Sequence, residues 1–226
     1  MEDTQTQKRH MTKQLIERET AERVSRIDRE FAEGFDAVNA LEKTVTIFGS
    51  ARFSEDNKYY QLARELGGRL AQEDYTVITG GGGGIMEAGN RGAFEAGGKS
   101  IGFNISLPHE QVLNPYTTSS MPFKYFFARK VILTYGAMGY VYFPGGFGTL
   151  DELFEIMTLI QTDKAPDAPI ILMGSEYWSG LSQFVREKLV DGVQTIGPND
   201  ESLYMITDSV DEAVEYIKSF QPPAAE

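Results

Sequence analysis

One short segment of the sequence carries residue types that could act on a phosphorylated ligand. It combines glycines, a threonine hydroxyl and two carboxylates in the run Phe143-Pro144-Gly145-Gly146-Phe147-Gly148-Thr149-Leu150-Asp151-Glu152. The glycines allow a strand to turn abruptly, and free amides at the start of a following helix can bind a phosphate. Thr149 and Glu152 also have the spacing of a capping box, in which both side chains satisfy first-turn amides. The pattern therefore leaves Glu152 open as a helix cap or as a catalytic carboxylate.

A repeating order of strands and helices must position this segment. From Thr44 onward, short apolar runs alternate with amphipathic stretches. The apolar runs predict strands at 45–48, 76–79, 100–103, 140–143, 169–173 and 204–206. Helices are predicted at 59–70, 85–96, 126–135, 149–161, 178–190 and 210–220, with a long loop at 104–122. This order predicts an α/β fold, a Rossmann-like doubly wound parallel sheet with helices on both faces.

Three predicted strands end in glycine-rich turns at the carboxyl edge of the sheet, where such folds bind ligands. These turns are Gly49-Ser50, the run from Gly80 to Gly84, and the segment from Gly145 to Thr149. We expect the first two turns to add secondary phosphate contacts through Gly49, Ser50, Gly81, Gly82 and Gly83. Neither turn has the G-x-G-x-x-G spacing of a dinucleotide site, so a dinucleotide is disfavoured and a mononucleotide remains possible.

Composition disfavours several classes of function. The chain has a net charge of −12, which argues against nucleic-acid binding because phosphate neutralisation needs a basic surface. It has no cysteine and only two histidines, so no disulfide can form and no residue spacing indicates a metal site. The uncharged stretch 131–150 has about the length of a membrane span but contains Pro144 and several glycines. We therefore expect a cytoplasmic protein that binds neither nucleic acid nor a membrane.

The N-terminal region follows a different pattern. Apolar residues recur there at helical spacing, at Val24, Ile27, Phe31, Phe35, Val38 and Leu41. We expect residues 1–42 to form a helical extension of a Rossmann-like nucleotide-binding domain at 43–226. The apolar face of this helix could pack on its own domain or form a contact between copies of the chain.

The pattern Pro-Gly-Gly-x-Gly-Thr-x-x-Glu in the glycine segment resembles the hallmark of the LONELY GUY (LOG) family. The resemblance extends to Arg129-Lys130, which lies 23 residues before Glu152, as the family's Arg-Lys pair does. Leu107-Pro108-His109-Glu110 is similar to the family's Pro-x-Glu segment, and Thr158 matches a family threonine that contacts the ligand. Gly84 to Glu87 and the N-terminal helix resemble the longer bacterial members.

This resemblance implies hydrolysis of the N-glycosidic bond of a purine (cytokinin or adenosine) 5'-monophosphate to free base and ribose 5-phosphate. The implied catalytic residues are Arg129 and Glu152. Glu152, ionised at neutral pH like an ordinary glutamate, would stabilise positive charge on the sugar or activate water, while Arg129 would anchor the ligand. The implied substrate contacts are Glu110, Arg129, Lys130, Gly145, Gly146, Phe147, Gly148, Thr149, Leu150, Asp151, Glu152 and Thr158. No cofactor is required.

Alternatives remain, both for the chain and for single residues. The same loop occurs in relatives that resemble a molybdenum-cofactor carrier, which holds a phosphorylated pterin without cleaving it. The chain could also sense a nucleotide through its N-terminal helix. Glu87 and Asp151 occupy positions where the helix dipole favours an acid in the first turn. The resemblance also implies a homodimer or a higher homo-oligomer.

Overall fold

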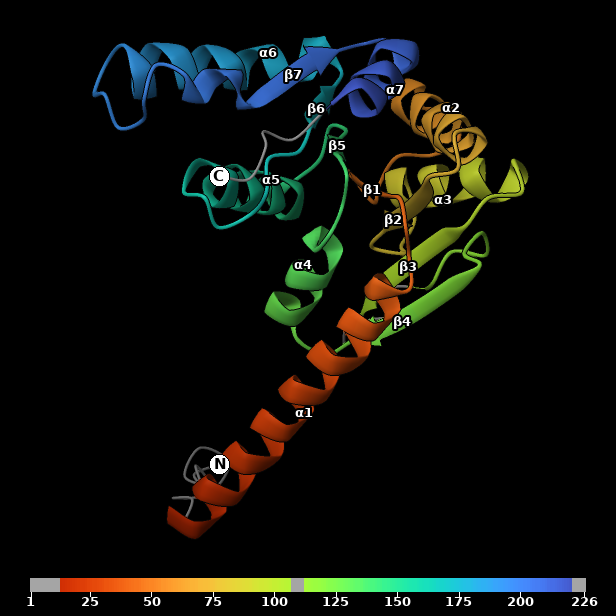
Figure 1. Ribbon diagram of the computed structural model, residues 1–226, viewed down its shortest axis with the longest axis vertical. Helices are drawn as coiled ribbons and strands as arrows, with labels where there is room; N and C mark the ends of the chain where they lie inside the picture. Colours follow the sequence, from red (N-terminus) through yellow and green to blue (C-terminus); the bar gives the residue numbers. More distant parts are fainter. Residues whose placement is uncertain (1–12, 107–111, 221–226) are drawn as a thin grey trace, which may run out of the picture.

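The computed structural model describes residues 13–106 and 112–220, and its strands form one parallel sheet (Figure 1). The strand order is β4-β3-β2-β1-β5-β6-β7, and every neighbouring pair is parallel. The strands are β1 Thr44–Phe48, β2 Thr76–Thr79, β3 Ser100–Ile105, β4 Ser119–Phe123, β5 Tyr140–Tyr142, β6 Ile170–Met173 and β7 Tyr204–Thr207. The predicted Rossmann-like doubly wound sheet is confirmed.

Helices cover both faces of this sheet. They are α1 Lys13–Asn39, α2 Lys58–Gln72, α3 Ile85–Glu95, α4 Phe126–Thr134, α5 Phe147–Gln161, α6 Ser175–Phe184 and α7 Val210–Ser219. One core joins α2, α3 and α7 to the sheet through residues such as Leu66, Ile85 and Val214. The other core joins α1, α4, α5 and α6 to the opposite face, with the buried residues Val38, Ile132, Ile156 and Trp178.

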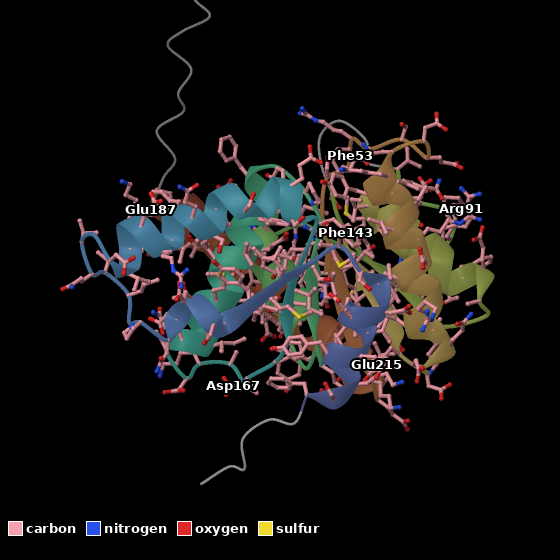
Figure 2. All side chains as sticks on the ribbon, turned by 90° about the horizontal axis from the view of Figure 1, so that it is seen from above. Phe53, Arg91, Phe143, Asp167, Glu187 and Glu215 are labelled. Carbon is pink, nitrogen blue, oxygen red and sulfur yellow. The ribbon has the colours of Figure 1, made fainter. Side chains whose placement is uncertain are left out.

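The sheet places a crevice between its two halves. β1 pairs with β2 on one side and with β5 on the other, so the chain order reverses there. In open α/β sheets this reversal leaves a crevice beyond the carboxyl ends of the two strands. The central strands β1, β2, β5 and β6 are fully buried and largely apolar, which suits a sheet covered on both faces. Figure 2 shows Phe143, which directly follows β5, in the crowded interior of the molecule.

Several of the predicted element boundaries were wrong. The expected loop at 104–122 contains most of strand β4, which lies at the sheet edge and is mostly exposed, so it lacks the apolar run of a central strand. Helix α5 begins at Phe147, two residues before the predicted start. The helix predicted at 178–190 begins at Ser175, and its second half, Val185–Val190, is π-helical. Helix α1 ends at Asn39, so Leu41 lies beyond it.

The N-terminal helix is only partly packed. Phe31, Phe35 and Val38 contact the core on the α4 side of the sheet, whereas Ile16 and Val24 are 46% and 59% exposed. Figure 1 shows the N-terminal part of α1 extending away from the rest of the protein. The interpretation that α1 packs on its own domain therefore holds for its C-terminal half. Across residues 13–106 and 112–220, no helix combines the length and the apolar character needed to cross a membrane.

Candidate active site

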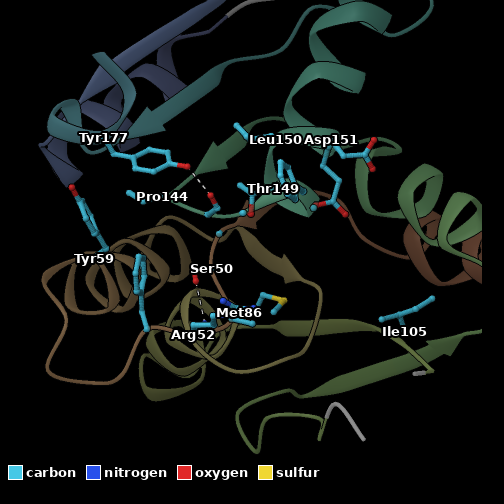
Figure 3. A pocket seen from close by; sticks show the side chains of 18 of the residues that line it. Ser50, Arg52, Tyr59, Met86, Ile105, Pro144, Thr149, Leu150, Asp151 and Tyr177 are labelled. Carbon is cyan, nitrogen blue, oxygen red and sulfur yellow. Dashed lines mark hydrogen bonds between the residues drawn. The ribbon is translucent and has the colours of Figure 1, made fainter. Parts of the chain in front are cut away.

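A cavity of about 1200 Å³ opens at the carboxyl ends of β1 and β5 (Figure 3). The β1 turn from Gly49 to Phe53 lines one side, and the loop and helix start from Pro144 to Glu152 line another. Arg129 and Lys130 of α4 also face it. The sheet thus brings most of the predicted site residues together, although they come from segments far apart in the sequence.

The start of α5 faces this cavity without a side-chain cap. Its N-cap residue is Gly146, which makes no side-chain cap hydrogen bond. Of the two readings that the sequence left open, the capping box does not fit the structure: Thr149 is the third helical residue, and Glu152 lies beyond the first turn. The sequence misplaced the start because Gly148 is a poor helix former and reads as part of the loop. The first-turn amides of α5 remain available to a ligand.

Glu152 is a mostly buried carboxylate beside these amides. Its side chain is 12% exposed. Burial raises the pKa of Glu152 to about 7, although the charges of Arg129 and Lys130 favour the ionised form. The expectation of an ordinary, fully ionised glutamate was wrong, since it ignored the desolvation that the fold imposes. A carboxyl group with a pKa near neutrality can both accept and donate a proton during catalysis.

Arg129 is the cation that faces Glu152. Its Nη1 lies 3.8 Å from Glu152 Oε1, and its Nε donates to the carbonyl of Phe103 at 2.7 Å. A Cβ on Gly80 would come within 2.1 Å of Arg129 Nη2, so the absence of a side chain at position 80 makes room for the guanidinium. Burial lowers the pKa of Arg129, and Glu152 opposes this, but a guanidinium stays charged in proteins.

Lys130 ties α4 to α5. Its Nζ lies 2.9 Å from Asp151 Oδ2 and 2.9 Å from Glu155 Oε2. Burial disfavours the charge of Lys130, but these two bonds outweigh burial and raise its pKa. The prediction that Asp151 is a first-turn acid was wrong, because it pairs with Lys130 beyond the first turn of α5. Glu87 does lie in the first turn of α3, as predicted, and accepts a hydrogen bond from the Tyr60 hydroxyl.

The two other glycine turns differ in their relation to the cavity. Gly49 and Ser50 line it, but Gly81, Gly82 and Gly83 do not. The Gly81 and Gly82 carbonyls accept hydrogen bonds from the backbone and side-chain amides of Asn114, respectively. The second turn is therefore bonded to Asn114, and its expected phosphate contacts stay a prediction.

Several lining residues were missed by the sequence reasoning. The Tyr177 hydroxyl donates to the carbonyl of Gly145 at 2.6 Å, which fixes the loop before α5 (Figure 3). Lys58 Nζ and Glu176 Oε2, at the starts of α2 and α6, pair at 2.6 Å across the cavity rim. All three follow strands that end at the same edge of the sheet. Inspection of the residues after every predicted strand could have found them.

Two predicted ligand contacts are not placed at the cavity. Thr158 is exposed, donates its hydroxyl to the Phe154 carbonyl and does not line the cavity. Glu110 lies outside the described residues, as does His109.

Comparisons with known proteins bear on this site. The model of a family described as "Possible lysine decarboxylase" matches residues 86–217. The chain is 25% identical to a cytokinin riboside 5'-monophosphate phosphoribohydrolase of Rhodococcoides fascians, over 78% of this chain and 90% of that protein. It is also 25% identical to the Arabidopsis thaliana phosphoribohydrolase LOG1, over 80% of this chain and 84% of that protein.

Two solved structures share the fold. The structural genomics target TM1055 is 27% identical, with a TM-score of 0.61 over 79% of this chain and all of that chain. The molybdenum cofactor binding protein of Rippkaea orientalis is 22% identical, with a TM-score of 0.58 over 79% of this chain and 96% of that chain. The family match covers more than half of the sequence and includes the segment that holds Arg129 and Glu152. The chain belongs to the LOG family.

Proposed function

We propose that this protein hydrolyses the N-glycosidic bond of a purine nucleoside 5'-monophosphate to free base and ribose 5-phosphate. One observation carries the proposal: a buried glutamate faces an arginine directly beside the uncapped start of α5. Glu152 and Arg129 line the same cavity as the loop from Gly145 to Thr149. A nucleotide needs three things of a site in one row. Its phosphate needs an anion site, its sugar needs a carboxylate nearby, and its base needs further cavity space.

The start of α5 suits a terminal phosphate. Its amides lack a side-chain cap, and a helix N-terminus favours negative charge. An added Cβ at Gly146 or Gly148 would meet no atom within 4 Å, so the backbone there faces open space. A phosphate held at this point leaves the sugar next to Glu152.

Glu152 suits the cleavage step. Breaking the bond leaves its electron pair on the base and positive charge on the sugar carbon, which water then attacks. Over the whole reaction one water is divided between the sugar carbon and the base. Ionised Glu152 stabilises the positive charge and takes a proton from the water. Because its pKa is about 7, it can pass that proton to the departing base at neutral pH.

Arg129 supports this step as a fixed positive charge. It cannot serve as a proton donor, since it does not lose its charge, so it contributes by hydrogen bonding to the ligand and by keeping part of Glu152 ionised. The names of the curated relatives support a cytokinin riboside 5'-monophosphate as one substrate to test. We propose AMP as the second.

The experiment measures free base by chromatography after incubation with AMP or with isopentenyladenosine monophosphate. We expect release by the wild type and a loss of about 10²- to 10⁴-fold in Glu152→Gln, the range for removal of an acid–base group. Glu215→Gln is the matched control, because Glu215 is exposed on α7. Binding of both nucleotides without release would overturn hydrolysis and favour a carrier or a sensor.

A further inference from the structure

A glutamate of the N-terminal helix caps the helix that carries Arg129. Glu30 is 8% exposed. Its Oε1 accepts from the backbone amide of Lys124 at 3.0 Å, and its Oε2 accepts from that of Tyr125 at 3.2 Å. Tyr125 is the N-cap residue of α4 and provides no side-chain cap of its own. Glu30 therefore does from another helix what the glutamate of a capping box does locally.

Tyr125 links the Glu30 contact to Arg129. The carbonyl of Tyr125 accepts a hydrogen bond of 3.1 Å from the backbone amide of Arg129, in the first turn of α4. Glu30 thus accepts a hydrogen bond from the backbone amide of Tyr125, and the backbone carbonyl of Tyr125 accepts one from the amide of Arg129. A carboxylate at a helix start is also favoured by the helix dipole.

The packing between α1 and α4 reinforces this contact. Phe35 and Tyr135 meet edge to face at 4.7 Å between ring centroids. A Cβ on Gly34 would come within 2.6 Å of Ile132 Cγ1, so the two helices approach closely at this point. The buried half of α1 therefore sets the position of α4 along its length.

We propose that Glu30 is a positioning residue for Arg129, and that α1 belongs to the catalytic unit. This inference rests on the proposed function. Arg129 meets Glu152 only at 3.8 Å, so its placement depends on the α4 backbone and on its bond to Phe103. Loss of the cap lets the first turn of α4 shift, and shifts of about 1 Å at a reacting centre can lower rates by about 100-fold.

The test is a double-mutant cycle in the full chain. Glu30→Ala is made in the wild type and in an Arg129→Lys background, and kcat and KM for AMP are measured. We expect kcat to fall about tenfold in the wild type and less than about twofold in Arg129→Lys, because contacts in one network are not additive. Glu33→Ala, an exposed glutamate of the same helix, should leave both values unchanged.

A purely structural role predicts other results. Equal losses in both backgrounds, or full activity of folded Glu30→Ala, would overturn the proposal. Glu30→Gln keeps one acceptor oxygen and should show a smaller loss of the same kind, so it decides the question if Glu30→Ala does not fold. The affinity for ribose 5-phosphate is measured in parallel. If the wild type releases no base, the proposed function fails. In that case the role of Glu30 is judged separately, and an unchanged affinity of folded Glu30→Gln for ribose 5-phosphate overturns it.

Discussion

Two glycine-rich turns that look alike in the sequence have opposite surroundings in the structure. Added Cβ atoms at Gly146 and Gly148, before and in the first turn of α5, would meet nothing within 4 Å. A Cβ on Gly84, before α3, would lie 2.3 Å from the Ser50 carbonyl, and Gly84 has a φ of +63°. The glycine-rich turn before α5 leaves room for a ligand, whereas the turn before α3 lets two backbone segments touch.

The run from Gly80 to Gly84 supports the β1 turn. Ile85 N–H donates to the Ser50 carbonyl at 3.0 Å, and Ser50 N–H donates to the Pro144 carbonyl at 3.0 Å. The buried turn thus holds the β1 turn, which in turn lies against the loop before α5. Glycine content alone does not distinguish a ligand loop from a support for one, but the space around Gly146 and Gly148 on one side and Gly84 on the other does.

The largest effect is expected at Gly84. Gly84→Ala places a side chain at a positive φ and against backbone, so we expect a loss of about 3 to 4 kcal/mol in the free energy of unfolding. Thermal and urea unfolding measure it. An alanine variant with wild-type stability would remove the distinction between the two turns.

The next effect is expected at Gly80, the position of the buried turn that faces the Arg129 guanidinium. Gly80→Ala directs a Cβ at Arg129 Nη2 and at Met86 Sδ, both of which end flexible side chains. We therefore expect a displaced arginine and a loss of about 100-fold in kcat/KM, with less destabilisation than in Gly84→Ala. Steady-state kinetics beside unfolding measure both. Unchanged kinetics would show that this placement of Arg129 does not matter.

A third effect concerns the pH dependence of stability. The pKa of Glu152 is raised to about 7 in the folded protein, above the value of about 4.3 of an unperturbed glutamate. Stability is therefore highest below pH 4.3 with respect to this group and falls as pH rises towards 7. Over this range the free energy of unfolding of the wild type should fall by on the order of 1 to 3 kcal/mol because of this group, and Glu152→Gln should not show that fall. Parallel pH curves of unfolding for the two proteins would contradict the shifted pKa.

The smallest effect is expected at Gly148, the matched control for Gly84. Gly148→Ala adds a methyl group in open space within a helix, so the stability should stay equal or rise by up to about 1 kcal/mol. If a phosphate binds at this helix start, the methyl group should raise KM about tenfold through close contact. Calorimetric binding of ribose 5-phosphate gives an independent value. A KM that does not change would place the phosphate elsewhere.

Much of the candidate site could be placed from the sequence. The central strands are short, largely apolar runs of the kind that a covered parallel sheet buries, and their alternation with helices specified the edge where Gly49, Ser50 and the loop before α5 meet. Arg129 and Glu152 were found through their spacing within a family pattern. Edge strand β4 was missed because one sheet neighbour does not demand an apolar run.

The tertiary structure decided the properties that depend on distance and burial. No local pattern shows that Glu152 is desolvated, that Gly80 faces Arg129, or that Glu30 caps α4 from 94 residues away. Periodicity and turn chemistry act between neighbours along the chain, so the sequence by itself determined the order of the elements and all of the strands except the edge strand β4. Desolvation, close approach and capping between helices act through space, and they arise only when the sheet brings separate segments together.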